Sequence, residues 1–249
     1  MSLESASTLP EMSEVWHQTL SWYPTNEQQN QLQKLYELII DANRYLNLTR
    51  ITEPEDFWEK HLWDSLVGVS PQQRFIDILH HGASVIDIGT GAGFPGLPIA
   101  IIFANSQVTL LDSTRKKINF IDGVIDNLAL KNAHTVVGRV EEIGQEIQHR
   151  GSYDLAVIRA VGSVSACVEY CLPLVKTGGL AVIYRGSFTA EENQSLENAV
   201  NIVGGEVELI TELKTPLTQS IRHCLYLRKV RHTPVSFPRP VGIPKQKPL

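Results

Sequence analysis

The sequence of 249 residues predicts an α/β fold, with a helical extension followed by a doubly wound, mostly parallel sheet of seven strands. From residue 84 onward, short apolar runs alternate with segments of helical periodicity, a pattern that builds a parallel sheet covered on both faces. The last two strand-like runs have no helix between them, so we expect them to pair as an antiparallel hairpin.

Hydrophobic periodicity predicts the individual elements. Residues 1–24 show no clear pattern, whereas 26–46 predict an amphipathic helix with Leu32, Leu35 and Ile39 on one face. The run Thr52-Glu-Pro-Glu55 fits a capping box that starts a helix through Leu66. A short helix is predicted at 72–79. The strands are predicted at 84–88, 107–111, 134–137, 153–158, 179–184, 205–211 and 222–229. The helices between them are predicted near 95–104, 114–129, 140–148, 163–175 and 190–203.

These elements predict three regions: a helical extension at 1–82, a sheet domain at 83–230 and a basic, proline-rich tail at 231–249. The composition is ordinary for a globular protein, with 43% apolar and 20% charged residues. We find no secretory leader and no apolar run long enough to span a membrane. The three cysteines have neither disulfide nor zinc spacing, so we expect core cysteines, no metal and a cytoplasmic location.

The net charge of -5 is unevenly distributed along the chain. Residues 1–60 hold ten acids, whereas 222–249 hold seven basic residues and no acid. This polarity favours a polyanionic partner and a merely solvated basic tail about equally.

The stretch Val85–Ala100, VIDIGTGAGFPGLPIA, carries the strongest functional signal. Its apolar strand runs into four closely spaced glycines, which allow tight turns and close approach of a ligand to the backbone. The next strand ends at Asp112, where a carboxylate can accept both hydroxyls of a ribose. The pattern therefore predicts a nucleotide or nucleoside site.

Two ligands compete for this site. Gly91 to Gly96 matches the G-x-G-x-x-G fingerprint of dinucleotide-binding proteins, which would make the chain an NAD(P)-dependent oxidoreductase. However, no second catalytic domain follows the sheet. Asp87-x-Gly89-x-Gly91-x-Gly93 has the spacing of class I methyltransferases, and a terminal antiparallel hairpin is their usual sheet ending. That fold would bind S-adenosylmethionine, with its adenine near Val140 and Glu141.

Motifs along most of the chain resemble the GidB/RsmG family of bacterial methyltransferases, which modify guanine N7 in small-subunit ribosomal RNA. The matching pieces are Asn47-Leu-Thr49, His61-x-x-Asp64-Ser-Leu66, Asp87 to Gly96, Leu111-Asp-Ser113, Arg139-Val-Glu-Glu142, Ile158-Arg-Ala160, Phe237-Pro-Arg239 and Lys247-Pro-Leu249. Ala92 and Phe94 depart from the proline and leucine common in the family, but neither change disturbs the glycines.

The resemblance implies a set of cofactor-binding residues around the glycine turn and the next two strands. They are Gly89, Gly91, Phe94, Asp112, Ser113, Thr114, Val140, Glu141 and Arg159. Arg159 is also predicted to position the reacting groups, because it ends a buried strand at the carboxyl edge of the sheet, where α/β folds bind ligands. His61, Asp64 and Ser65 share one helix, and we favour structural roles for them.

Guanine N7 already carries a lone pair and no proton, so the predicted reaction needs no general base. Orientation and exclusion of water would supply the catalysis, acting on an unstacked guanine. Neither the proline-rich motif of amine methylation nor the Pro-Cys nucleophile of pyrimidine C5 methylation is present. Basic residues predicted to bind RNA are Arg115, Lys116, Arg139, Arg185, Arg239, Lys245 and Lys247.

We therefore predict a monomeric, S-adenosylmethionine-dependent methyltransferase that acts on guanine N7 of 16S rRNA within the 30S subunit or a precursor. The alternatives are the oxidoreductase and a non-catalytic nucleotide-sensing or RNA-binding module.

Overall fold

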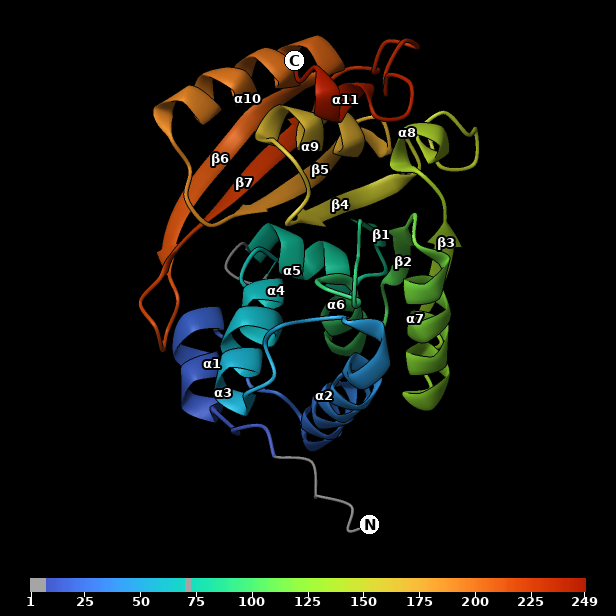
Figure 1. Cartoon of the computed structure of the whole chain (residues 1–249). Helices are drawn as coiled ribbons and strands as arrows, with labels where there is room; N and C mark the ends of the chain where they lie inside the picture. The colour runs from blue at the N-terminus through green and yellow to red at the C-terminus, as the bar shows by residue number, and fades with distance from the viewer. Residues whose placement is uncertain (1–7, 70–72) are drawn as a thin grey trace.

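A seven-stranded sheet forms the centre of the molecule (Figure 1). The computed structural model describes residues 8–69 and 73–249. The strand order is β3-β2-β1-β4-β5-β7-β6, in which β1 to β5 pair in parallel and β7 runs antiparallel to both β5 and β6. The strands are β1 (Ser84–Ile88), β2 (Gln107–Asp112), β3 (Ala133–Val137), β4 (Tyr153–Arg159), β5 (Val175–Arg185), β6 (Gly205–Lys214) and β7 (Ile221–Lys229). All seven predicted strands and the terminal hairpin are confirmed.

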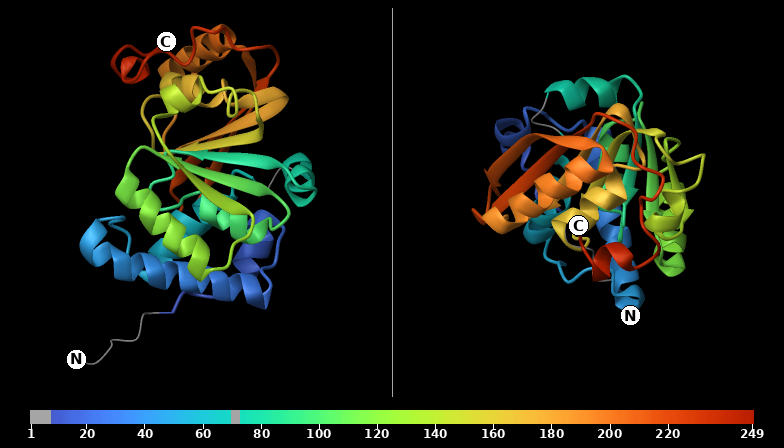
Figure 2. Two further views of the ribbon diagram at one scale, coloured as in Figure 1. Left: turned by 90° about the vertical axis from the view of Figure 1, so that its right-hand side faces the viewer. Right: turned by 90° about the horizontal axis from the view of Figure 1, so that it is seen from above.

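Helices cover both faces of this sheet, as the alternating pattern predicted. Helices α2, α6 and α7 lie on one side and α9 and α10 on the other (Figures 1 and 2). The helices of the extension are α1 (Ser13–Leu20), α2 (Asn26–Leu46), α3 (Pro54–Phe57), the π-helix η1 (Trp58–Trp63), α4 (Asp64–Leu66) and α5 (Gln73–His80). The remaining helices are α6 (Gly96–Ile102), α7 (Arg115–Asn127), α8 (Val140–Ile143), α9 (Val164–Cys171), α10 (Ala190–Val203) and α11 (Ile243–Gln246).

Alternating strand residues build two hydrophobic layers. Val85, Val108 and Val157 belong to the core that also contains α6, α7 and the extension. Their neighbours Ile86 and Ile158 point to the opposite face and pack with α9 and α10. Because successive side chains of a strand point to opposite faces, both faces of the central strands are buried, as in other covered parallel sheets. All three cysteines are free and buried in these layers, as predicted.

The start of the extension differs from the prediction. The structure contains α1, which periodicity missed because only Trp16 and Leu20 of its eight residues are buried. The ring centroids of Trp16 and Trp58 are 4.6 Å apart, and this contact joins α1 to η1. Two anchoring residues in so short a helix give too weak a periodic signal to recognise.

Two local predictions were wrong. Thr52 forms no capping box: the helix is capped by Glu53 without a side-chain hydrogen bond, although Pro54 does occupy its first turn. Capping boxes form instead at Thr25 with Gln28, at the start of α2, and at Thr189 with Glu192, at the start of α10. Helix α8 ends at Ile143, short of the predicted 148, because the chain turns repeatedly from Gly144 onward.

The extension is also tied to the tip of the terminal hairpin. The carboxylate of Glu59, fully buried on η1, accepts hydrogen bonds from the backbone N–H groups of Leu217 and Thr218 and from the Thr218 hydroxyl. A buried carboxylate with three donors is well satisfied. The contact therefore fixes the hairpin tip against the N-terminal helices.

The C-terminal tail folds back along α8 and α9 and ends in α11. The Arg150 guanidinium donates to the backbone carbonyl groups of Thr233, Pro234 and Phe237. No helix within residues 8–69 or 73–249 is long and apolar enough to cross a membrane.

Candidate cofactor and acceptor site

The glycine turn after β1 has the backbone geometry that its sequence indicated. Gly89 and Gly91 have φ values of +69° and +63°, in the left-handed region that favours glycine. The buried Asp87 carboxylate accepts a hydrogen bond of 2.8 Å from the N–H of Gly96, at the start of α6. Burial raises the pKa of Asp87 to about 6. A Cβ on Gly96 would lie 2.8 Å from that carboxylate, so only glycine fits there.

Asp112 connects this turn to the next one. Its Oδ2 accepts from the N–H of Gly91 at 3.1 Å, and its Oδ1 accepts from the N–H of Thr114 at 2.8 Å. The Lys117 ammonium lies 3.9 Å from Oδ2. Carboxylate oxygens have two lone pairs each, so Asp112 retains acceptor capacity for the two hydroxyls of a ribose.

A first cavity of about 350 Å³ opens beside Asp112 at the carboxyl ends of β1 and β2. Five of the predicted cofactor-binding residues line it: Gly89, Asp112, Ser113, Thr114 and Val140. Sequence reasoning did not assign Lys117, Ala160 or Tyr170 to this cavity. The dimensions and the mix of polar and apolar groups suit a nucleoside.

Glu141 lies buried behind the wall of the first cavity. Its Oε1 accepts from Arg139 at 2.9 Å and from the N–H of Gly242 at 3.0 Å. Burial by itself raises the pKa of Glu141, but these hydrogen bonds outweigh it and leave the pKa below its ordinary value. Glu141 is therefore charged, and it holds Arg139 and the tail in place.

A second cavity of about 460 Å³ lies on the other side of Ala160, which lines both cavities. It is lined by Ile51, Lys60, His61, Asp64, Arg159, Ala160, Tyr184, Arg185, Gly186, Arg222, His223 and Cys224. Arg159, predicted to contact the cofactor, thus lines the second cavity, where its guanidinium lies 5.6 Å from the centre of the Phe94 ring.

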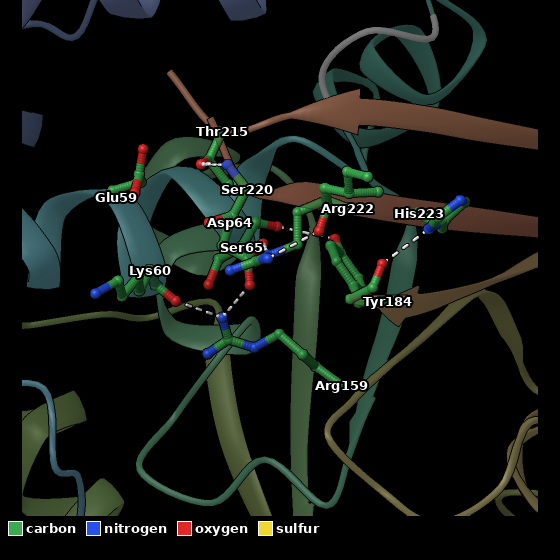
Figure 3. Close-up of polar contacts among 12 residues, drawn as sticks. Glu59, Lys60, Asp64, Ser65, Arg159, Tyr184, Thr215, Ser220, Arg222 and His223 are labelled. Carbon is green, nitrogen blue, oxygen red and sulfur yellow. Dashed lines mark hydrogen bonds and ion pairs between the residues drawn. The ribbon is translucent and has the colours of Figure 1, made fainter. Parts of the chain in front are cut away.

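A charged cluster forms one wall of the second cavity (Figure 3). Asp64 accepts from Arg159 Nη1 at 2.8 Å through one carboxylate oxygen and from Arg222 Nε at 3.0 Å through the other. Arg159 Nη1 also donates to the backbone carbonyl of Lys60 at 2.9 Å. One carboxylate thus fixes two guanidinium groups, which leaves a net positive charge on this wall.

His61 supports the cluster as a neutral ring. It stacks on Phe94 with ring centroids 4.5 Å apart, and its Nε2 lies 2.8 Å from the Thr49 hydroxyl. Burial, and then the nearby charge of Arg159, lower the pKa of His61 to about 3. The ring therefore acts as packing and hydrogen-bonding scaffold at neutral pH, in line with the structural role favoured from the sequence.

The predicted RNA-binding residues divide into two groups. Arg139, Arg185 and Arg239 already bind the carboxylates of Glu141, Glu192 and Glu169. Arg115, Lys116, Lys245 and Lys247 are exposed, and we find no carboxylate partner for them in the part of the chain that the structure describes. RNA binding by all seven residues stays a prediction.

Sequence reasoning missed Arg222 as a site residue, because its partner Asp64 lies 158 residues away in the chain. The signal in the sequence was weak, a basic residue at the start of a predicted strand whose centre is apolar. Among the described residues, no group of His, Cys, Asp and Glu side chains is arranged to hold a metal ion.

Solved structures share the fold. A 16S rRNA (adenine(1408)-N(1))-methyltransferase from Catenulisporales acidiphilia, solved with its cosubstrate SAM, has a TM-score of 0.52 and 15% identity, covering 65% of this chain and 92% of that one. A branched-chain polyamine synthase from Thermus thermophilus has a TM-score of 0.54 and 12% identity, covering 68% of this chain and 56% of that one. Since their activities differ, these likenesses indicate the fold alone.

Sequence relatives are much closer. A protein named ribosomal RNA small subunit methyltransferase G from a Nostoc species is 66% identical over 97% of this chain and 98% of its own length. Proteins of the same name from Trichormus variabilis and Microcystis aeruginosa are 67% and 51% identical, covering 97% and 89% of this chain and 98% and 99% of their own lengths. The family model described as rRNA small subunit methyltransferase G matches residues 28–224. The chain therefore belongs to the rRNA small subunit methyltransferase G family.

Proposed function

We propose that the chain transfers the methyl group of S-adenosylmethionine to N7 of a guanine in 16S rRNA. Membership of the family and the names of its relatives support the rRNA methyltransferase activity. The observation that carries the assignment of sites is the pair of cavities meeting at Ala160. One has the groups to hold a nucleoside, and the other is lined by cations suited to an RNA nucleotide.

The residues of the first cavity fit S-adenosylmethionine. Asp112 would accept the ribose hydroxyls, and Val140, the first residue of α8, would flank the adenine. When bound, the cofactor supplies an electrophilic methyl group on a sulfonium. Gly89 allows the chain to turn beside it, because a Cβ there would lie 2.8 Å from a methyl of Val161.

The buried Asp87 of β1, whose carboxylate lies against the start of α6, favours S-adenosylmethionine over a dinucleotide. In a dinucleotide-binding fold, the pyrophosphate sits on the N–H groups that begin this helix. Here the Gly96 N–H donates to the Asp87 carboxylate, and an anion placed beside that acid would be repelled. The oxidoreductase alternative therefore lacks its phosphate site.

The second cavity would receive the guanine with N7 directed toward Ala160. Because N7 has a free lone pair, the residues around it need only bind, orient and exclude water. The charged cluster would orient the nucleotide through the guanidinium groups of Arg159 and Arg222, which Asp64 holds in place. An unstacked base suits this cavity better than a paired one, so we expect an RNA loop as the target.

The test is methyl transfer from labelled S-adenosylmethionine to 30S subunits, precursors and naked 16S rRNA from cells that lack this chain. We expect label in one guanine that becomes sensitive to the reduction and cleavage diagnostic of N7 methylation. Protection against heat by NAD but not by S-adenosylhomocysteine would instead support the oxidoreductase. Cofactor binding without turnover would support a sensing or RNA-binding module.

The same proposal includes a monomer acting in the cytoplasm, where ribosomal subunits are assembled. Sedimentation of the purified chain tests the oligomeric state.

A further inference from the structure

The C-terminal tail supplies part of the first cavity. Lys245, on α11, lines that cavity together with Thr114, Lys117 and Arg139, although it lies beyond the residues 28–224 that the family model matches. The sequence suggested an RNA contact for Lys245. Its position in the structure beside the predicted adenosine site points to a different role.

We propose that Lys245 is a cofactor-binding residue, which donates a hydrogen bond to the adenosine part of S-adenosylmethionine. The proposal rests on the function proposed above and extends it to a segment outside the matched family region. The tail is then a wall of the cofactor site, and cofactor binding and tail docking stabilise each other.

A single buried acid joins the tail to the cavity. Glu141 Oε1 accepts from the N–H of Gly242 at 3.0 Å and from Arg139 Nη2 at 2.9 Å. Gly242, with φ of +82°, precedes α11, and Pro244 in that helix is buried. Lys245 therefore follows a fixed point of the tail by three residues, and it faces a cavity that Arg139 also lines.

Further contacts fix the tail upstream of α11. Arg239 donates to the fully buried Glu169 carboxylate through its backbone N–H at 2.7 Å and through Nη2 at 2.6 Å. A Cβ on Gly144 would lie 2.6 Å from Pro238 Cγ, so glycine lets the tail approach α8 closely. These contacts hold the tail on α8 and α9 by buried charge and close packing, which limits the positions open to Lys245.

The charges in the first cavity leave Lys245 available for a ligand. The two other cations that line it have acidic partners: Lys117 lies 3.9 Å from Asp112, and Arg139 binds Glu141. For Lys245 we find no such partner within the described residues. Adenosine offers ring nitrogens and ribose oxygens as acceptors, so the ammonium group can donate to it without displacing an existing ion pair.

The first test compares two exposed lysines of the same tail. We expect Lys245→Ala to weaken binding of S-adenosylhomocysteine in calorimetry by roughly tenfold, the loss of one charge-assisted hydrogen bond. Lys247→Ala, which removes a lysine outside the cavity lining, should stay within about twofold of the wild type. Lys245→Arg, which keeps a donor, should recover much of the affinity.

RNA binding by the same variants separates the two roles of Lys245. If Lys245→Ala leaves the affinity for S-adenosylhomocysteine unchanged and lowers only the affinity for 16S rRNA, the residue is an RNA contact and the inference is wrong. If the wild type itself fails to bind S-adenosylhomocysteine, the proposed function fails instead.

The second test uses the reciprocity of coupled binding. Of the basic residues after His232, Arg239 and Lys247 each precede proline, so trypsin can cut the tail only after Lys245. We expect saturating S-adenosylhomocysteine or 5′-methylthioadenosine to slow release of the last four residues by roughly the same tenfold factor, and methionine to have no effect. An unchanged cleavage rate with bound S-adenosylhomocysteine would show that the tail is not part of the cofactor site.

Discussion

Replacing Asp64 by asparagine tests whether the charged cluster serves the acceptor side of the site. The carboxylate is 10% exposed, and the Arg159 and Arg222 side chains that it binds are 14% and 24% exposed. Removing one partner of a buried ion pair costs about 3–5 kcal/mol, because the remaining charge is left uncompensated. Asparagine keeps one acceptor and the guanidinium groups retain some solvent, so we expect about 3 kcal/mol less free energy of unfolding.

The measurement is urea denaturation, with Asp56→Asn as the matched control. Asp56 binds Lys60 at 2.6 Å, but their side chains are 44% and 33% exposed, so its loss should cost less than about 1 kcal/mol. Because neither guanidinium lines the first cavity, Asp64→Asn should leave the affinity for S-adenosylhomocysteine near the wild-type value and lower methyl transfer at least about tenfold. Equal stability losses in both variants, or full turnover by Asp64→Asn, would refute this account of the cluster.

Four further predictions follow from the site and its supports. Asp112→Ala should weaken S-adenosylhomocysteine binding in calorimetry by at least about tenfold, with exposed Asp126→Ala as control; equal affinities would remove Asp112 from the site. The pKa of His61 is lowered to about 3 in the folded chain. Below about pH 6.5, His61 is therefore protonated in the unfolded chain but stays neutral in the folded chain. The free energy of unfolding should therefore fall by about 2 kcal/mol between about pH 6.5 and pH 5, a loss that disappears in His61→Gln; persistence of the full loss in that variant would assign it to other groups. Changing Arg115 and Lys116 together to glutamine should weaken RNA binding and reduce the slope of log affinity against log salt by about 1–2, and an unchanged slope would mean that neither residue contacts phosphate. Gly96→Ala, whose Cβ would lie 2.8 Å from Asp87 Oδ2, should unfold at lower urea concentration than Gly123→Ala, whose Cβ meets nothing within 4 Å; equal midpoints would show that the turn adapts.

The local sequence pattern was sufficient to predict the sheet and much of the cofactor side of the site. The glycine turn and Asp112 are close to strand ends that periodicity defines, so topology alone brings them to one edge of the sheet. The sequence therefore predicted Gly89, Asp112, Ser113, Thr114 and Val140 as part of the first cavity, but it did not place Lys117, Ala160, Tyr170 or Lys245 there.

The acceptor side could not be predicted in the same way. The charged cluster combines Asp64 of α4, Arg159 at the end of β4 and Arg222 of β7. Asp64 lies 95 residues from Arg159 and 158 residues from Arg222 in the chain, so the role of each side chain depends on a distant partner. Hydrophobic periodicity carries no information about ion pairs between such distant residues. The capping boxes were missed for a different reason: Thr25, Thr52 and Thr189 all begin suitable patterns, and the local sequence does not show that only the first and the third form.

The contact between Glu59 and the hairpin tip bears on when this enzyme becomes competent during its own synthesis. The second cavity combines Ile51, His61 and Asp64 with Arg222 and His223, and Glu59 holds the two regions together across 158 residues. Contacts of such sequence separation form late, since a long loop must close first. On the function proposed above, a nascent chain lacks part of the second cavity until Arg222 and His223 have been synthesised and packed against the extension, so we expect no guanine binding before that point.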